Sequence, residues 1–286
     1  MTSRRFFAAA LGSLAAGCSP LRAFDAVTPA DSGGRLVARG VRYGDDPRQA
    51  LDLYAPRGEG PWPLVVFFYG GSWNSGERAG YGWLGRALAS RGFLTAVPDY
   101  RLVPAVRYPA FLEDAAAAVA EARRQAPRLG GDPGRVLVVG HSAGAYMAAQ
   151  VVLDRRFLRA AGVPGEAIRG VAGLAGPYDF LPFDVRASRE AFAGHPRPEE
   201  TQPVTHVRAD APPFWLATGS EDDTVRPRNS LALAERLRAA GARAEVKLYP
   251  GLDHMGIVLA LSRPFRGPAP VLADMTGFFH AQSRAV

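Results

Sequence analysis

Apolar runs of strand length alternate along this chain with segments whose apolar positions recur at helical spacing. Residues 64–69, 93–98 and 135–140 are runs of the first kind, and such runs are typical of strands buried on both faces of a parallel sheet. Further strands are expected at 169–175, 214–219 and 244–249, and helices at 83–91, 111–125, 143–153, 228–240 and 271–282.

The domain opens with a different pattern. Residues 36–43 and 49–54 alternate apolar and polar side chains around the turn-forming residues 44–47, which predicts an antiparallel strand pair. The later strands alternate with helices, and this order predicts an α/β fold with a mostly parallel, doubly wound sheet and helices on both faces. We expect a single domain over residues 35–286, because α/β folds of this length often form around one sheet.

Residues 176–213 break this rhythm, because they are rich in Pro, Arg and polar residues and only weakly periodic. We expect a lid-like insertion over the carboxyl edge of the sheet, where ligands bind in open α/β sheets. Its aromatic residues fit an apolar pocket wall and core packing equally well: Tyr178, Phe180, Phe183 and Phe192.

Composition narrows the function classes. With 48% hydrophobic and 21% charged residues, the chain resembles an ordinary globular protein. The net charge is +7, but the basic residues are scattered arginines with Lys247 as the sole lysine, so we expect no nucleic-acid partner. The single cysteine, Cys18, excludes an intramolecular disulfide.

The first 18 residues resemble an export signal, with Arg4 and Arg5 before a short apolar stretch. The arginine pair is similar to the twin-arginine signature. Cys18 follows Leu-Ala-Ala-Gly, which resembles a lipoprotein cleavage box, and an ordinary cleaved signal with a chance cysteine is the alternative. Residues 19–34 are expected to form a tether of low structural content. These features predict a bacterial protein that is periplasmic or anchored to the membrane through a lipid on Cys18.

The segment Gly-His-Ser-Ala-Gly at 140–144 places Ser142 between a predicted strand and a predicted helix. A serine nucleophile must be exposed near a base and near groups that stabilise an oxyanion, and a sharp strand-to-helix turn provides the exposure. Small residues are needed on either side of such a turn, and Gly140 and Gly144 meet that need. We therefore expect Ser142 to be a nucleophile.

A base and an acid follow Ser142 in the order typical of this kind of site. His254 comes after the strand predicted at 244–249 and is the expected general base, whereas His141 adjoins the nucleophile and is expected to point elsewhere. The strand at 214–219 leads into three consecutive carboxylates, any of which could orient the imidazole: Glu221, Asp222 and Asp223.

Together these residues resemble the esterase/lipase group of α/β-hydrolases, which includes hormone-sensitive-lipase-like, feruloyl-esterase-like and kynurenine-formamidase-like enzymes. The resemblance implies an eight-stranded sheet with an antiparallel N-terminal pair. It also selects Asp222 as the acid, because the family pattern G-x-x-D-x-x-V falls on Gly219, Asp222 and Val225. Asp99 and Arg101 match a further family segment and are expected to be hydrogen-bonded near the sheet edge.

The family's oxyanion segment His-Gly-Gly-x-Trp is matched by residues 69–73, where Tyr69 replaces the usual histidine. The resemblance implies an oxyanion hole formed by the backbone amides of Gly70, Gly71 and Ala143, which do not depend on the side chain at position 69. Residues expected to line the substrate pocket are Ser72, Trp73 and Tyr178.

The implied reaction is acyl transfer by a carboxylesterase acting on a small-molecule ester of small or medium acyl chain, with no cofactor and no metal. One alternative is an aryl formamidase that uses the same residues on an N-formylkynurenine-like amide. Another is a non-catalytic binding protein of the cell envelope. The sequence does not indicate an oligomeric state.

Overall fold

One eight-stranded sheet runs through the protein in the order β1-β2-β4-β3-β5-β6-β7-β8. The structure is a computed structural model and describes residues 20–284. The strands are β1 (Gly34–Arg42), β2 (Ala50–Pro56), β3 (Trp62–Phe68), β4 (Leu94–Pro98), β5 (Gly131–His141), β6 (Ile168–Leu174), β7 (Phe214–Gly219) and β8 (Ala244–Tyr249). β2 pairs antiparallel with β1 and β4, and the other neighbours are parallel. The expected α/β fold is confirmed.

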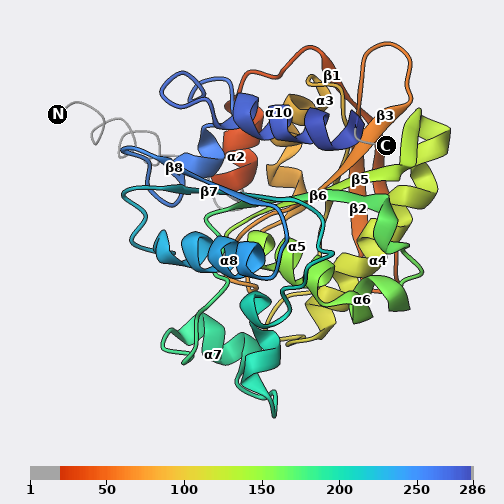
Figure 1. The fold of residues 1–286 in the computed structure, drawn as a ribbon. Helices are drawn as coiled ribbons and strands as arrows, with labels where there is room; N and C mark the ends of the chain where they lie inside the picture. The colour runs from red at the N-terminus through yellow and green to blue at the C-terminus, as the bar shows by residue number, and fades with distance from the viewer. Residues whose placement is uncertain (1–19, 285–286) are drawn as a thin grey trace.

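Helices cover both faces of this sheet. In Figure 1, α3 and α10 lie on one face, and α4, α5 and α8 lie on the other. The bounds are α3 (Gly82–Ala89), α4 (Ala110–Gln125), α5 (Ala143–Leu153), α6 (Arg155–Ala160), α8 (Arg228–Ala239), α9 (Gly256–Leu259) and α10 (Val271–Arg284). Short 3-10 turns are η1 (Arg78–Gly80), η2 (Ala126–Leu129), η3 (Gly165–Ala167), η4 (Pro198–Thr201) and η5 (Pro203–Thr205).

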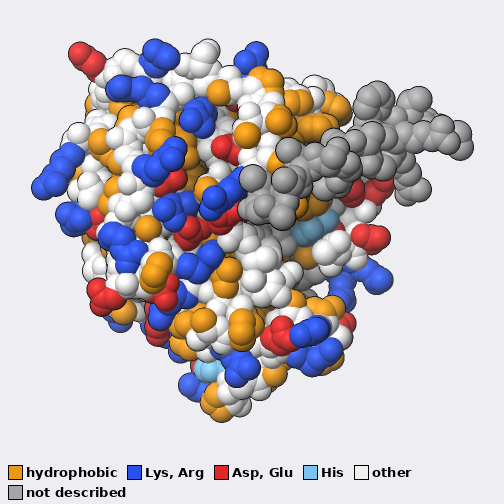
Figure 2. Space-filling view, turned by 180° about the vertical axis from the view of Figure 1, so that it is seen from behind, with side chains coloured by type: hydrophobic (Ala, Val, Ile, Leu, Met, Phe, Trp, Pro, Cys, Tyr) orange, Lys and Arg blue, Asp and Glu red, His pale blue; other side chains and the backbone are white. Residues whose placement is uncertain are grey.

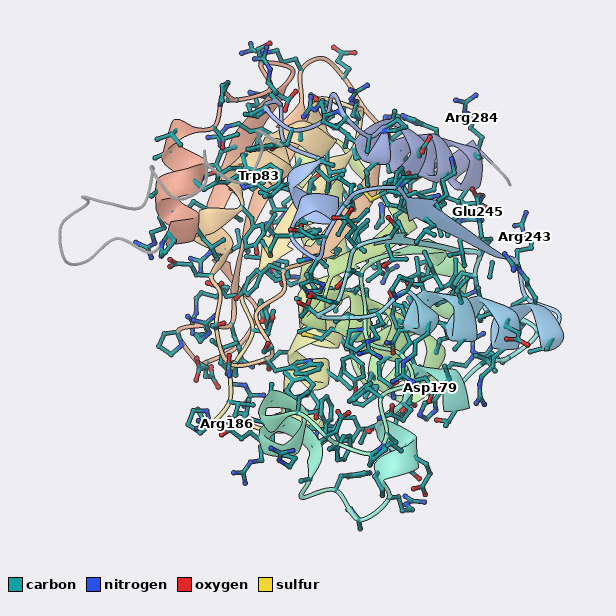
Figure 3. All side chains as sticks on the ribbon, turned by 90° about the vertical axis from the view of Figure 1, so that its left-hand side faces the viewer. Trp83, Asp179, Arg186, Arg243, Glu245 and Arg284 are labelled. Carbon is teal, nitrogen blue, oxygen red and sulfur yellow. The ribbon has the colours of Figure 1, made fainter. Side chains whose placement is uncertain are left out.

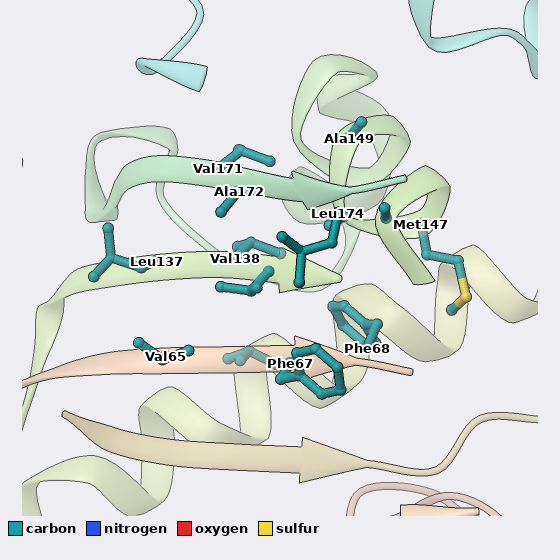
Figure 4. Close-up of a cluster of buried hydrophobic side chains, with 14 of the residues drawn as sticks. Val65, Phe67, Phe68, Leu137, Val138, Met147, Ala149, Val171, Ala172 and Leu174 are labelled. Carbon is teal, nitrogen blue, oxygen red and sulfur yellow. The ribbon is translucent and has the colours of Figure 1, made fainter. Parts of the chain in front are cut away.

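The centre of the core lies between β3, β5, β6 and α5. Figure 4 shows Phe67 and Phe68 of β3 near Val138 of β5 and Leu174 of β6, with Met147 from α5 beside them. All residues of α5 are buried, because the helix is apolar on every side and packs between the sheet and the neighbouring helices. This packing fixes the N-terminus of α5 directly after the end of β5.

The segment expected to be a tether is instead ordered against the domain. Residues 20–27 form helix α2 (Pro20–Val27), and Phe24 packs edge-on against Trp83, with 5.6 Å between ring centroids. Figure 3 shows Trp83 beside this helix. Asp25 accepts a hydrogen bond of 2.6 Å from the amide of Trp83, at the start of α3. Further contacts are the ion pairs Arg22–Glu77 and Asp31–Arg266 and the hydrogen bond from Arg263 to the Ala30 carbonyl.

The tether prediction was therefore wrong for the described part of 19–34. Its small and polar residues suggested a linker, but Leu21 and Phe24 lie on one side of a helix and contact residues that are distant in sequence. The expected export signal, including Cys18, lies outside the described residues.

The insertion at 176–213 leaves the carboxyl end of β6 and returns to β7. It contains helix α7 (Arg186–Phe192) with η4 and η5, and it forms the lower end of the molecule in Figure 1. Phe192 is buried against Trp73 and Tyr146, with ring centroids 4.8 and 5.3 Å apart. The insertion thus packs on the loop after β3 and on the first turns of α5.

Charged side chains of both signs are mixed on one face of the molecule. On the face drawn in Figure 2, Lys and Arg side chains are interspersed with acidic and uncharged ones. Within residues 20–284, no helix combines the length and apolar character needed to cross a membrane.

Candidate active site

Ser142 lies in the tight turn between β5 and α5. Its backbone has φ 54° and ψ −123°, a conformation that costs a residue with a side chain of order 1–3 kcal/mol and persists only where the surroundings impose it. The amide of Ser142 donates to the carbonyl of Leu174 on β6 across 2.8 Å, and its carbonyl accepts from the amide of Tyr146 in α5. The strand and the helix together hold the turn in place.

Two glycines allow this turn to form. A Cβ atom at Gly140 would lie 2.1 Å from the carbonyl oxygen of Gly144, and one at Gly144 would lie 2.0 Å from the carbonyl oxygen of Phe68. Both distances are far below van der Waals contact, so a side chain at position 140 would push β5 and α5 apart, and one at position 144 would push α5 away from β3. The glycines of the sequence motif are explained by this close approach.

Three side chains from separate loops form a continuous hydrogen-bonded chain. Nε2 of His254 lies 2.9 Å from Oγ of Ser142, and Nδ1 of His254 lies 2.9 Å from a carboxylate oxygen of Asp222. A carboxylate only accepts hydrogen bonds, so Nδ1–H donates to Asp222 and Nε2 is left to accept the Ser142 hydroxyl. The arrangement can remove a proton from the serine.

The structure distinguishes Asp222 from its acidic neighbours. The Asp222 side chain is fully buried, and its other carboxylate oxygen accepts hydrogen bonds from the amides of Thr224 (3.1 Å) and Val225 (2.8 Å). Glu221 and Asp223 are exposed. Asp222 is therefore the carboxylate held against the imidazole.

The loop that carries His254 packs closely on the loop that carries Asp222. The amide of Glu221 donates to the carbonyl of Leu252 across 3.0 Å, and a Cβ at Gly219 would lie 2.0 Å from that same carbonyl. Asp253 accepts from the amide of Gly256 (2.7 Å) at the start of α9. These contacts fix the two loops relative to each other.

His141 points away from the serine hydroxyl, but it is not remote from the site. Its Nε2 lies 2.9 Å from the backbone carbonyl oxygen of His254, and the two rings are 5.0 Å apart. The ring is 2% exposed, and burial, with the nearby His254, lowers the pKa of His141 to about 3. Sequence patterns could not have revealed this contact, because its partner lies in a loop 113 residues away.

The loop after β3 brings Gly70 against Ser142. A Cβ at Gly70 would lie 3.0 Å from Cβ of Ser142 and 3.0 Å from Nδ1 of His141. Gly71 has φ 128°, which favours glycine, and its carbonyl accepts from the amides of Asn74 and Ser75. The chain thus turns back with backbone amides near Ser142.

Ala143 supplies a further amide beside the serine, because it is the first residue of α5. The first amides of a helix have no partner within the helix and carry partial positive charge. We considered the backbone hydrogen bonds in residues 20–284 that lie outside regular helices and strands. None of them is donated by the amide of Gly70, Gly71 or Ala143. Their role as oxyanion donors stays a prediction.

Tyr69, at the position where the resemblance led us to expect histidine, anchors the loop that carries Gly70 and Gly71. Its buried phenol donates to Asp99 (2.7 Å) and accepts from Arg48 (2.8 Å), and the Tyr69 carbonyl accepts from the phenol of Tyr100 (2.9 Å). Burial, together with nearby Tyr100 and Asp99, raises the pKa of Tyr69, so the phenol stays protonated as a donor. Asp99 also pairs with Arg78. This network was not foreseen from the sequence, although Asp99 was expected to be hydrogen-bonded.

Arg101, the other residue of that segment, pairs with buried Asp114 on α4, and their closest atoms are 2.7 Å apart. The contact ties the loop after β4 to α4.

Comparison with known families agrees with this geometry. The model of the BD-FAE family matches residues 51–237, which include Gly70, Ser142 and Asp222. The chain belongs to the BD-FAE family. His254 lies beyond the matched region, on the loop after β8.

Two curated relatives extend this BD-FAE assignment. The chain is 32% identical to an isoprenylcysteine alpha-carbonyl methylesterase of Arabidopsis thaliana over 87% of its own length and 63% of that protein. It is 33% identical to the esterase LipC of Mycobacterium tuberculosis over 76% of its own length and 59% of that protein. The chain therefore spans less than two thirds of each relative.

Solved structures confirm the α/β-hydrolase fold of this BD-FAE domain. Esterase B from Lactobacillus rhamnosis superimposes with a TM-score of 0.80 at 24% identity, covering 92% of both chains. A hormone-sensitive lipase from a metagenome library gives a TM-score of 0.75 at 22% identity, covering 94% of this chain and 93% of the other.

The residues expected to line the pocket have different surroundings. Ser72 is exposed on the loop beside the site, whereas the Trp73 ring is 5% exposed within the aromatic cluster beneath the insertion. The prediction for Tyr178 was wrong, because its side chain is fully buried. A Cβ at Gly173 would lie 1.9 Å from the Tyr178 hydroxyl and one at Gly176 would lie 2.4 Å from it, so the ring fills space left by two glycines.

The part of the BD-FAE chain described here contains no group of three or more His, Cys, Asp or Glu side chains suited to hold a metal ion.

Proposed function

We propose that this protein is a carboxylesterase that hydrolyses esters of small or medium acyl groups through an acyl-enzyme on Ser142. The observation that carries the proposal is the hydrogen-bonded chain from Ser142 through His254 to buried Asp222, with both links at 2.9 Å. A serine hydroxyl is a weak nucleophile at neutral pH, and an oriented base within hydrogen-bond reach activates it.

In the acylation step, Ser142 Oγ bonds to the ester carbonyl carbon while His254 Nε2 takes the hydroxyl proton. The imidazolium that forms is stabilised by Asp222 through Nδ1–H. Negative charge develops on the carbonyl oxygen, where the amides of Gly70 or Gly71 and of Ala143 would donate hydrogen bonds. The tetrahedral intermediate collapses, the carbon to alcohol-oxygen bond breaks, and His254 gives its proton to the leaving alcohol.

Deacylation repeats the chemistry with water. His254 removes a proton from water as the water oxygen attacks the acyl carbon, and the bond to Ser142 Oγ breaks as His254 returns a proton to the serine. The products are a carboxylic acid and an alcohol. The residues present account for each proton transferred, so this route requires no cofactor.

The choice of an ester substrate rests on the relatives. One is named a methylesterase and the other an esterase, and both names describe cleavage of esters. An amide such as N-formylkynurenine would use the same residues, so a formamidase is the competing enzyme. A binding protein without turnover is the competing non-enzyme.

Hydrolysis assays distinguish these functions. The purified protein would be given p-nitrophenyl esters from acetate to decanoate, a carboxyl methyl ester and N-formylkynurenine. We expect the highest kcat/KM on a short or medium ester, and Ser142→Ala should lower kcat by about 10⁶-fold. Faster cleavage of the formamide would favour the formamidase, and ester hydrolysis unaffected by Ser142→Ala would refute the mechanism. An inactive parent protein would favour the binding protein.

We also propose that the protein is exported and anchored through a lipid on Cys18. Support comes from the arginine pair at positions 4 and 5 and the Leu-Ala-Ala-Gly-Cys sequence that follows. Incorporation of labelled palmitate into the parent protein but not into Cys18→Ala is the expected result. Equal labelling, or a processed N-terminus elsewhere than Cys18, would contradict lipidation.

A further inference from the structure

The adjacent residues His141 and Ser142 both contact His254, one at its main chain and the other at its ring. Ser142 Oγ lies 2.9 Å from the ring atom Nε2 of His254, and Nε2 of His141 lies 2.9 Å from the backbone carbonyl oxygen of His254. One contact reaches the side chain of the base and the other its main chain. Both start from the same tight turn after β5.

The direction of the second hydrogen bond is fixed by its acceptor. A backbone carbonyl can only accept, so Nε2 of His141 carries the hydrogen. In a neutral ring Nδ1 then keeps its lone pair, and this atom is buried without a hydrogen-bond partner among the described residues. A second N–H at Nδ1 would have no acceptor there, so His141 is a neutral donor. It adds no positive charge beside His254 when that ring becomes an imidazolium.

Within the described part of the chain, no second hydrogen bond to the His254 carbonyl is found. His254 lies in the turn between β8 and α9, where the carbonyl of Asp253 accepts from Ile257 and that of Met255 accepts from Leu259. Among the hydrogen bonds found within residues 20–284, the carbonyl of His254 accepts only from His141. The peptide that carries the base is held at this point by one side chain.

We propose that His141 is a positioning residue, which fixes the main chain of His254 so that its ring points at Ser142. The inference rests on the proposed esterase function, since it concerns the base of that reaction. Misplacing a reacting group by about 1 Å can cost about 10²-fold in rate. A side chain that merely filled the space beside Gly70 would not need a donor at the Nε2 position.

A matched pair of variants separates these roles. Glutamine places its amide nitrogen where histidine has Nε2, whereas asparagine is one methylene shorter and cannot reach the His254 carbonyl. We expect His141→Gln to keep kcat within about threefold of the parent, and His141→Asn to lower kcat by about 30-fold or more. KM should change little in either variant. Thermal unfolding followed by circular dichroism would show that both variants are folded at the assay temperature.

Equal kcat values for the two folded variants would overturn the proposal, whether both stayed high or both fell. A second measurement does not depend on turnover or on a variant folding. In ¹⁵N-histidine-labelled parent protein, the His141 ring should appear as the neutral Nε2–H tautomer from pH 5 to 8. Detection of the Nδ1–H tautomer would refute the hydrogen bond on which the inference rests.

Failure of the proposed function would look different. A fluorophosphonate should label Ser142 in the parent protein and label it more slowly in His141→Asn. A parent protein that neither hydrolyses esters nor reacts with this probe would refute the esterase function, while the tautomer measurement would still report on His141. An active parent protein with equally fast labelling of both His141 variants would refute only the positioning role.

Discussion

The phenol of Tyr69, the residue before the glycine pair at positions 70 and 71, donates a hydrogen bond of 2.7 Å to the carboxylate of Asp99. Arg48 donates to the same phenol, and Arg78 pairs with the same carboxylate. The loop expected to stabilise the oxyanion is thus tied to a buried ionic network through a side chain. Its supporting residue is a tyrosine, which reaches Asp99 on the loop after β4.

Removing the Tyr69 hydroxyl should weaken the attachment of the loop that carries Gly70 and Gly71. Tyr69→Phe leaves Arg48 and Asp99 without a shared partner, and we expect the free energy of unfolding to fall by about 1–3 kcal/mol. We expect kcat to fall only about threefold, because the backbone amides of Gly70 and Gly71 remain. Urea denaturation and ester hydrolysis measure the two effects. Tyr54→Phe is the control, because Tyr54 is buried and no hydrogen bond of its phenol is found among the described residues. Its ring contact with Arg86 does not need the hydroxyl. An equal loss in both variants would contradict a specific role for Tyr69.

Two neighbouring carboxylates provide a test of the acid. Asp222→Asn should lower kcat by about 10⁴-fold, because an amide at this position cannot stabilise the imidazolium of His254 and can hold the ring in the wrong tautomer. Asp223→Asn should leave kcat within about twofold, since that side chain is exposed. Steady-state kinetics on one short ester checks both values. A large loss in Asp223→Asn alone would reverse the assignment.

The buried His141 makes stability depend on pH. The folded protein holds the pKa of His141 at about 3, mainly through burial, whereas unfolded histidine titrates at about 6.5. The unfolded chain therefore binds this proton first, so the stability due to neutral His141 is complete above about pH 7 and declines as the pH falls below about 6.5. Between pH 7 and 5 this one group should cost about 2 kcal/mol.

Denaturation curves at pH 7, 6 and 5 measure that loss, and His141→Gln serves as the reference because glutamine does not titrate. The stability difference between parent and variant should shift by about 2 kcal/mol in favour of the variant over this range. Parallel pH dependence of the two proteins would show that His141 does not remain neutral through burial.

The N-terminal helix should stabilise the domain rather than act as a linker. Asp25 accepts a hydrogen bond from the amide of Trp83 at the start of α3, the role that a capping side chain usually has. Asp25→Ala should reduce the free energy of unfolding by about 0.5–2 kcal/mol. The exposed Asp45 provides a matched control, and Asp45→Ala should change stability by less than about 0.5 kcal/mol. Chemical denaturation that gave equal values for both variants would contradict the docking of α2.

Much of the fold is determined by local sequence. The apolar runs that form β3, β5 and β7 must be buried on both faces, so their length and order already predict a parallel sheet. The turn at Ser142 is equally local, because Gly140 and Gly144 lie within two residues of it and allow its backbone conformation.

Other features depend on contacts between distant segments. Asp222 and Asp223 are adjacent carboxylates, and only the fold buries the first against His254, 32 residues away, and leaves the second exposed. Tyr178 was expected to line the pocket because it is an aromatic residue in the insertion. In the structure its ring fills space beside Gly173 and Gly176 in the core.

The N-terminal helix and the contact of His141 also depend on residues that are distant in the sequence. The polar and small residues after Pro20 suggested a tether, yet Phe24 finds an aromatic partner in Trp83, which local composition cannot reveal. The sequence by itself determined the strands, the helices and the nucleophile turn, because these depend on neighbours along the chain. The family pattern already favoured Asp222 as the acid, but only the tertiary structure buries it against His254 and decides which side chain holds the main chain of His254, because each partner arrives on a separate loop.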